Sequence, residues 1–370
     1  MPESDWPSDE LLILSAADVQ AALDHREGAV IDAVEQAYLR HREGRTDLPH
    51  SSFLRFGADR PDRIIALPGR IEDDAPIAGI KWIASFPGNV QRGMARASAL
   101  LIVNSTETGR PTAVIESSII SAQRTAASAA LAARELHAIG EETTLGLIGC
   151  GVINFEIARF VLSVAPRLDT LLLYDLDPAR AETFATRVQQ ELGSSPGPAS
   201  GAALGPAPGR GEGSAAGEGR RRLSCRVVAD TRAVVAGARL VSFATVASTP
   251  HVDDLDWSPG HTVLHVSLRD LSPRLILQAD NVTDDIDHVL RANTSLHLTE
   301  QAAGNRDFVR CALADILAGA SPRRVGGRPL VFSPFGLGIL DLALARVVVA
   351  HARANGTGVR VADFLPAFTG

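Results

Sequence analysis

Two charged side chains stand in apolar segments, where a charge costs free energy unless it is paired or used in chemistry. Lys81 interrupts the apolar run 78–84, and Asp270 follows the strand predicted to begin at Thr262. Burial disfavours the charged form of a lysine, which suits it to general acid–base catalysis. We predict that Lys81 and Asp270 are catalytic. The alternatives are an edge-strand lysine with its amino group in water and an acid at a helix N-terminus.

Two arginines stand among the same apolar segments. Arg55 follows an apolar pair, and Arg124 begins an alanine-rich stretch that predicts a helix over 124–137. A guanidinium binds a carboxylate through two parallel hydrogen bonds, so both arginines are candidate carboxylate ligands. The alternative is that each is a structural or surface residue.

A strand, a glycine-rich loop and a helix follow one another from residue 145. Gly149 permits the tight turn, and Gly151 lets the backbone approach a phosphate, which the helix N-terminus also attracts. A second strand ends at Asp175, where an acid accepts hydrogen bonds from an adenosine ribose and repels a 2′-phosphate. Asn154 occupies the third glycine position of this motif. The segment predicts NAD rather than NADP; the alternative is a tight turn in an ordinary α/β domain.

The rest of the chain alternates between strand and helix patterns, which indicates an α/β protein. We predict strands at 11–14, 51–56, 63–67, 77–85, 97–103, 112–115, 225–229, 240–244 and 262–266. We also predict helices that begin after Ser15 and Asp177 and helices near 307–318 and 338–354. Residues 194–222 are almost all Gly, Ala, Pro, Ser and charged residues, so they predict a disordered insert.

The composition limits the class of protein. The 370 residues are enough for two domains, and the net charge of −7 argues against nucleic acid as a partner. The three cysteines are too widely spaced for a metal or disulfide pattern, and we predict no bound metal. His261 and His265 lack a third ligand, so we interpret them as structural. Without a signal peptide or a membrane-spanning run, the sequence predicts a soluble cytoplasmic protein.

Short motifs along nearly the whole chain follow the order found in one known family. They are Ile80-Lys81, Phe86–Asn89, Thr108–Pro111, Arg124–Ala127, Gly149-x-Gly151, Asp175, Ala244-Thr245 and Gly336–Asp341. In this order the chain resembles the ornithine cyclodeaminase/mu-crystallin family. The resemblance implies a Rossmann NAD-binding domain at 131–327, which contains the 194–222 insert. It also implies an α+β substrate-binding and dimerisation domain formed by 1–130 with 328–370.

The same resemblance implies roles for individual residues. Arg55 and Arg124 correspond to carboxylate-binding arginines, Lys81 to a catalytic lysine and Asp270 to a catalytic aspartate. The expected cofactor contacts are Gly149, Gly151, Val152, Ile153, Asn154, Asp175, Ala244, Thr245 and Ser267. We expect a small amino-acid substrate and a homodimer.

Three phrases are similar to a narrower branch of the family, the N-(2-amino-2-carboxyethyl)-L-glutamate dehydrogenases, which make 2,3-diaminopropionate for siderophores and peptide antibiotics. These phrases are Lys81–Asn89, Glu116–Ser121 and His265–Pro273. This implies an NAD-dependent oxidative hydrolysis that yields L-2,3-diaminopropionate and 2-oxoglutarate. The substrate has three carboxylates, for which Arg92, Arg96 and Arg269 offer further cations.

Other activities within the family remain alternatives: ornithine cyclodeaminase, alanine dehydrogenase and ketimine reductase. Ser267-Leu268-Arg269 stands where ordinary cyclodeaminases have a glycine-rich approach to the aspartate, which argues against ornithine cyclisation. A mu-crystallin-like small-molecule-binding protein is an alternative of another class. Intact Lys81 and Asp270 argue against it, because binding alone needs neither.

Overall fold

The computed structural model describes residues 10–57, 60–193 and 223–366, and the predicted insert at 194–222 lies outside them. The chain divides into two compact units. The first contains Met1–Arg26, Gln36–Arg124 and Leu337–Gly370, and the second contains Glu27–Glu35 and Thr125–Gly336. Each unit has a sheet with helices packed on it, so the predicted α/β class is confirmed. The functional roles of the two predicted domains stay predictions.

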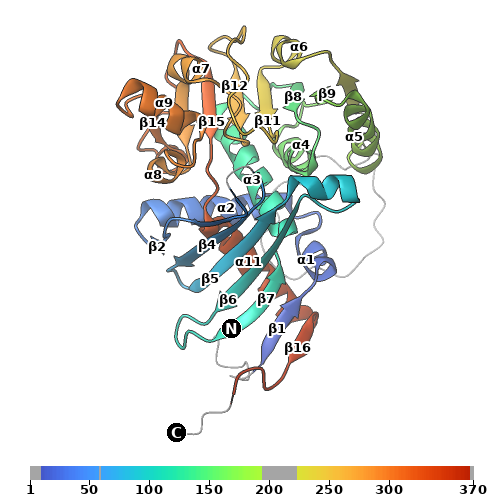
Figure 1. The fold of residues 1–370 in the computed structure, drawn as a ribbon, viewed down its shortest axis with the longest axis vertical. Helices are drawn as coiled ribbons and strands as arrows, with labels where there is room; N and C mark the ends of the chain where they lie inside the picture. Colours follow the sequence, from blue (N-terminus) through green and yellow to red (C-terminus); the bar gives the residue numbers. More distant parts are fainter. Residues whose placement is uncertain (1–9, 58–59, 194–222, 367–370) are drawn as a thin grey trace. The chain divides into compact units, whose positions relative to one another are not determined.

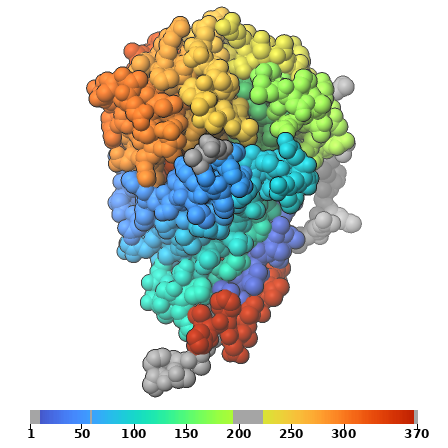
Figure 2. Space-filling view, viewed as in Figure 1, coloured from blue at the N-terminus to red at the C-terminus, as the bar shows by residue number. Residues whose placement is uncertain are grey.

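The sheet of the first unit is mixed, with β1 and β7 parallel and its other neighbouring strands antiparallel. The strand order is β16-β1-β7-β6-β5-β4-β2, and β3 pairs with β4. The strands are β1 Leu11–Leu14, β2 Thr46–Asp47, β3 Ser52–Arg55, β4 Arg63–Ile71, β5 Ile77–Ser85, β6 Ala97–Asn104, β7 Pro111–Glu116 and β16 Val359–Val361. In Figure 2 the red residues near the C-terminus lie against the violet-blue residues of β1, as the pairing of β1 with β16 requires.

One face of this sheet is covered by a long helix. The helix α11, Gly338–Asn355, packs on β4, β5 and β6 (Figure 1). The odd-numbered side chains of β5 face it, because a Cβ at Gly79 would lie 3.1 Å from the Leu342 side chain. The short helix α1, Ala16–Leu23, also contacts α11 and begins with the predicted cap at Ser15. As a result, β5 is central, and every second side chain of it is covered.

The second unit contains an eight-stranded sheet whose neighbouring strands are all parallel. Its order is β10-β9-β8-β11-β12-β15-β13-β14. The strands are β8 Thr144–Ile148, β9 Thr170–Tyr174, β10 Ser224–Val227, β11 Leu240–Phe243, β12 Thr262–His265, β13 Asp280–Thr283, β14 Val309–Ala312 and β15 Leu330–Ser333. The strand order reverses between β8 and β11, and in such sheets ligands bind outside the carboxyl ends of the strands at that point.

The helices of the second unit connect these strands. They are α4 Val152–Val164, α5 Pro178–Glu191, α6 Thr231–Gly237, α7 Pro273–Gln278, α8 Ile286–Val289, α9 Ser295–Ala303 and α10 Leu313–Leu317. The predicted cap of α5 is confirmed, because the Asp177 side chain accepts the Ala179 N–H at 3.0 Å. Two further helices, α2 Glu27–Arg42 and α3 Ser118–Leu136, contribute residues to both units.

Two predicted helices have different bounds. The helix expected to begin at Arg124 begins at Ser118, because the Glu116 carboxylate accepts the backbone N–H groups of Ser118 and Ile119 at 2.7 and 3.3 Å. Arg124 therefore lies within the helix rather than at its start. The helix expected near 307–318 is shorter: Val309–Ala312 pair with β13 as an edge strand, and helix follows only from Leu313.

Candidate active site

Lys81 lies on the covered face of β5 and has a buried carboxylate as its partner. Its Nζ is 2.6 Å from Oδ2 of Asp341 on α11 and 3.3 Å from Oγ of Ser121 on α3. Arg124 donates from Nε to Oδ1 of the same carboxylate at 3.3 Å. Lys81 is 2% exposed and Asp341 0%. The alternative of an edge-strand lysine with its amino group in water is therefore wrong.

The surroundings of Lys81 change its acidity. Burial lowers the pKa of Lys81 to about 8; the attraction of Asp341 opposes this shift, and the repulsion of Arg124 adds to it. An amine with a pKa near the operating pH can both accept and return a proton during a reaction. Lys81 thus has the acidity that acid–base catalysis needs.

Lys81 is also the only lysine in the chain, since all others of its 36 lysines and arginines are arginines. An arginine keeps its proton in a protein, whereas a buried lysine loses its proton readily. The single lysine of the chain therefore lies at a position where its side chain is deeply buried and its pKa is lowered. The presence of a single lysine is visible in the sequence, and it points to Lys81 as the apolar surroundings of this residue do.

Sequence reasoning did not assign a role to Asp341. Its signal was available, because Asp341 is the single charged residue in the apolar run 338–345. A charge on a buried helix face requires a partner. Only the structure identifies that partner, since Lys81 and Asp341 are 260 residues apart.

In the second unit Asp270 is completely buried within a set of hydrogen-bond donors. Its Oδ1 accepts the Thr245 hydroxyl at 2.5 Å, and its Oδ2 accepts the Ser267 hydroxyl. His265 Nε2 is 3.2 Å from Oδ2. Leu268 has φ +68, and this turn in the chain lies between Ser267 and Asp270. The alternative of a helix N-terminal acid is wrong, because α7 has its cap at Ser272.

The hydrogen bonds decide the charge of Asp270. Burial alone raises the pKa of a carboxyl group, but the bonds from His265, Ser267 and Thr245 outweigh it and lower the pKa of Asp270. Asp270 is therefore ionised at neutral pH and is a weak base. Such a carboxylate is suited to stabilising a cation, while Lys81 is the better proton carrier.

The glycine loop after β8 fits a dinucleotide. Gly149 has φ +90, and a Cβ there would lie 2.6 Å from the Ala244 carbonyl oxygen. Around Gly151 there is open space, and α4 begins there without a side-chain cap, so its first amides are available to phosphate oxygens. The Asp175 carboxylate accepts the N–H groups of Cys150 at 2.8 Å and Asp177 at 3.0 Å, which holds it beside the loop.

Asn154 explains the irregular third position of the glycine motif. Its side-chain amide donates to the carbonyl oxygens of Ile148 at 2.9 Å and Gly149 at 2.7 Å. The Ser242 hydroxyl on β11 donates to its Oδ1 at 2.7 Å. The asparagine is fully buried, and its hydrogen bonds connect β8, the loop and β11. The third glycine of the usual motif allows the helix to pack closely on the strand. Asn154 at this position instead stabilises the loop through its side-chain hydrogen bonds.

A profile of the ornithine cyclodeaminase/mu-crystallin family matches residues 9–195. The chain belongs to this family. The N-((2S)-2-amino-2-carboxyethyl)-L-glutamate dehydrogenase of Staphylococcus aureus is 26% identical over 94% of this chain and 97% of its own length.

Two solved structures resemble the fold of the present chain over nearly its whole length. Delta(1)-pyrroline-2-carboxylate reductase of Thermococcus litoralis, in complex with NADH and L-proline, has a TM-score of 0.81 at 23% identity and covers 95% of this chain and 100% of its own. An archaeal alanine dehydrogenase dimer with bound NAD has a TM-score of 0.78 at 22% identity and covers 96% of this chain and 100% of its own. The predicted family and fold are thus confirmed.

The other cofactor contacts expected from the family lie at one edge of the parallel sheet. Val152 and Ile153 form the first turn of α4, and Val152 is exposed. Ala244 and Thr245 follow β11, and Ser267 follows β12. The structure therefore brings these residues to the edge at which the strand order reverses.

The two arginines expected to bind one carboxylate are placed differently. Arg124 is buried beside Asp341, whereas Arg55 is exposed on β3, with its guanidinium 5.4 Å from the centre of the Phe53 ring. Within the described part of the chain they share no partner. Arg55 instead lies directly opposite Arg63, a residue that sequence reasoning did not single out.

The remaining predicted arginines have separate surroundings. Arg92 ends the helical turn Pro87–Arg92 and is exposed. Arg96 donates from Nη1 to the Ser85 hydroxyl at 2.8 Å. Arg269, in the second unit, donates to the carbonyl oxygen of Ala292 at 2.8 Å, which occupies part of its guanidinium.

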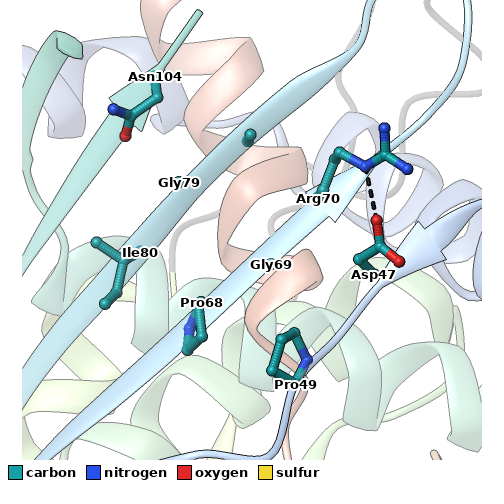
Figure 3. Close-up of a pocket in the computed structure, with 9 residues that line it drawn as sticks. Asp47, Pro49, Pro68, Gly69, Arg70, Gly79, Ile80 and Asn104 are labelled. Atoms are coloured by element: carbon teal, nitrogen blue, oxygen red, sulfur yellow. Dashed lines mark hydrogen bonds and ion pairs between the residues drawn. The ribbon is translucent and has the colours of Figure 1, made fainter. Parts of the chain in front are cut away.

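A shallow hollow on the uncovered face of the first sheet does not offer comparable chemistry. Its lining residues are Asp47, Pro49, Pro68, Gly69, Arg70, Ala78, Gly79, Ile80 and Asn104. Its two charged residues pair with each other, with Arg70 Nε 2.8 Å from Asp47 Oδ2 (Figure 3). In the ranges that the structure describes, no three acidic, His or Cys side chains are placed to hold a metal ion, and no helix is long and apolar enough to cross a membrane.

Proposed function

We propose that the protein is an NAD-dependent enzyme that oxidatively hydrolyses N-(2-amino-2-carboxyethyl)-L-glutamate to L-2,3-diaminopropionate and 2-oxoglutarate, for siderophore or peptide-antibiotic biosynthesis. The observation that carries the proposal is Lys81, a buried lysine with a pKa of about 8 beside a second cation, Arg124. The Staphylococcus aureus dehydrogenase of this name matches over 94% of the chain, which supports this substrate. The open glycine loop and the Asp175 carboxylate support NAD.

The chain's own residues then have distinct tasks. NAD, held at the Gly149–Gly151 loop and Asp175, would supply the hydride acceptor for the glutamyl α-carbon, and the oxidised substrate would then be a cationic imine. Arg124 holds the α-carboxylate, and the ionised Asp270 stabilises the cation. Lys81 takes a proton from the water that adds to the imine carbon and gives a proton to the departing nitrogen. The C–N bond then breaks, and the products are the ketone of 2-oxoglutarate and the free amine of diaminopropionate.

One assay tests this function. Purified protein is mixed with NAD and N-(2-amino-2-carboxyethyl)-L-glutamate, and NADH absorbance and product masses are followed. We expect NADH, 2-oxoglutarate and diaminopropionate in equal amounts. NADH formation with L-alanine but not with this substrate would favour alanine dehydrogenase, which the archaeal enzyme's similarity makes the second candidate. Deamination of ornithine alone would favour an ornithine cyclodeaminase, and reduction of an imine alone would favour a ketimine reductase. Binding of NAD without turnover of any of these substrates would favour a small-molecule-binding protein.

Asp175→Ser is expected to weaken NAD binding about 10- to 100-fold, since hydrogen bonds to a charged group contribute about 1.5–3 kcal/mol. Removing the negative charge also removes the repulsion of a 2′-phosphate, so the affinity for NADP should rise. Calorimetric titration with both dinucleotides measures the two changes. The control is Asp169→Ser, an exposed acid just before the same strand. If NADP affinity fell together with NAD affinity, Asp175 would support only the loop.

We also propose a cytoplasmic homodimer that forms through the uncovered face of the first unit's sheet. Trp82, Leu100 and Leu54 are 43%, 49% and 50% exposed, and Trp82 pairs directly with Leu100. A second copy of the chain would bury these apolar side chains. The solved archaeal relative is a dimer.

Trp82→Glu combined with Leu100→Glu is therefore expected to convert a dimer into a monomer, as measured by light scattering. The charges would be costly to bury in an interface. Leu277→Glu, at a 44% exposed leucine of α7, is the control and should leave the mass unchanged. A wild-type monomer, or a double variant that remains a dimer, would contradict this interface.

A further inference from the structure

Arginines from three strand regions of the first unit gather around one row of its sheet. The Cα of Arg63 on β4 pairs with Arg55 on β3 and with Ser85 on β5. Arg96, just before β6, donates to the Ser85 hydroxyl at 2.8 Å. The side chains of Arg55, Arg63 and Arg96 therefore surround this row; we call them the arginine cluster.

The members of the cluster repel one another. Burial lowers the pKa of Arg63, and the charge of Arg55 lowers it further. Burial likewise lowers the pKa of Arg96, and the charge of Arg63 adds to it. Like charges on directly opposite strand positions destabilise a sheet. The repulsion among the three arginines therefore does not stabilise the fold of the first unit.

No carboxylate of the described ranges, 10–57, 60–193 and 223–366, forms an ion pair with any of the three. The acid beside Arg63 in the sequence, Asp62, pairs instead with Arg60 at 2.5 Å. Elsewhere in the unit the partly buried Arg346 has the Asp73 carboxylate at 2.8 Å. The arginine cluster thus carries positive charge that an anionic ligand could neutralise.

The cluster lies on the same face of the sheet as Lys81. Ser85 follows Lys81 by four residues on β5, and side chains at even separations along a strand share a face. Four residues correspond to about 13 Å of strand at about 3.3 Å per residue. Arginine and lysine side chains shorten this span for a ligand held between them. The distance suits an extended molecule with an anionic group at each end.

We propose that Arg55, Arg63 and Arg96 form a second carboxylate subsite, which binds a substrate carboxylate remote from the carbon that is oxidised. Guanidinium forks bind carboxylates through paired hydrogen bonds, and three of them match a group that carries more than one acceptor. The inference rests on the proposed function only in assigning substrate binding to the first unit. It deepens that function, because it selects amino acids with several carboxylates over alanine, proline and ornithine. It also reassigns Arg55 from the α-carboxylate to the remote one.

The test compares Arg63→Gln and Arg96→Gln with Arg70→Gln in the full chain. Arg70 is on the same strand as Arg63 but faces the other side, where it pairs with Asp47. For N-(2-amino-2-carboxyethyl)-L-glutamate we expect KM to rise at least about 10-fold in each of the first two variants, with kcat within about 3-fold and an unchanged Kd for NAD. Arg70→Gln should leave all three constants unchanged. Arg63→Lys should recover part of the loss, since it restores the charge but not the fork.

A binding experiment separates this inference from the proposed function. Calorimetry with 2-oxoglutarate and with pyruvate, in the presence of NAD, compares a dicarboxylate with a monocarboxylate. If 2-oxoglutarate binds more tightly and Arg63→Gln removes that advantage, the subsite is supported even without turnover of the proposed substrate. Normal KM values in both Arg63→Gln and Arg96→Gln overturn the subsite while the function stands. Equal binding of the two acids by the wild type overturns it as well.

Discussion

Lys81→Arg and Lys81→Met are both expected to lower kcat by about 100- to 10,000-fold, the usual contribution of a positioned acid–base group. NAD binding should stay within about 2-fold of the wild type, since the glycine loop and Asp175 belong to the other unit. Arginine retains the positive charge beside Asp341 but does not release its proton at neutral pH. Rapid mixing with substrate and NAD, followed by NADH absorbance, measures the chemical step.

The arginine variant makes this result specific. If Lys81 served only as a cation that balances Asp341 or attracts a carboxylate, Lys81→Arg would retain much of the activity and only Lys81→Met would lose it. Ser121→Ala is the control, because it removes the other hydrogen-bond partner of Nζ, at 3.3 Å, without removing the amine. Its effect should be below about 10-fold, the loss of roughly one ordinary hydrogen bond.

Asp341→Asn is expected to lower the free energy of unfolding by about 3–5 kcal/mol, because it leaves two buried cations without their shared carboxylate. Lys81 and Arg124 are 2% and 9% exposed, so water cannot replace the lost partner. Urea unfolding followed by circular dichroism measures the loss. The control, Asp73→Asn, removes a more exposed partner of Arg346, and its cost should stay below about 2 kcal/mol.

The same variant has a pH signature. The attraction of Asp341 opposes the lowering of the Lys81 pKa by burial, so its removal should move that pKa below about 8. We expect the wild type to show an ionisation near pH 8 in its pH profile of kcat/KM, and this ionisation should shift to lower pH in any active Asp341→Asn preparation. An unchanged profile would assign that ionisation to another group.

Local patterns predicted much of the fold. The apolar stretches of β5 and β1 predicted both strands with the bounds that the structure has, and the alternation of strand and helix patterns along the chain indicated the α/β class. The start of α3 was missed because a glutamate side chain caps a serine-rich stretch that looks like a loop. Val309–Ala312 was assigned to a helix because its strand character depends on pairing with β13, which no local pattern contains.

The candidate site was predicted only in part, because local patterns do not contain contacts between residues far apart in the sequence. Lys81 and Asp270 were conspicuous as charges in or beside apolar segments, and glycine spacing located the dinucleotide loop. Asp341 and Arg63 were missed as partners, since α11 and the register of β3, β4 and β5 place them. Sequence reasoning also assigned Arg55 and Arg124 to one carboxylate; the structure places Arg55 on β3 opposite Arg63, and Arg124 on α3 beside Asp341. The roles assigned to these residues stay predictions until the variants are measured.

The single lysine has a practical consequence for chemical labelling. Reagents that acylate or reductively methylate primary amines have only the chain terminus and Lys81 as targets, because every other basic side chain is arginine or histidine. Since Lys81 is 2% exposed and paired with Asp341, its modification requires the first unit to open locally. The mass shift of one peptide therefore records the opening of the covered face of β5, and its slowing by a ligand records occupancy at the lysine, without a probe or an engineered residue.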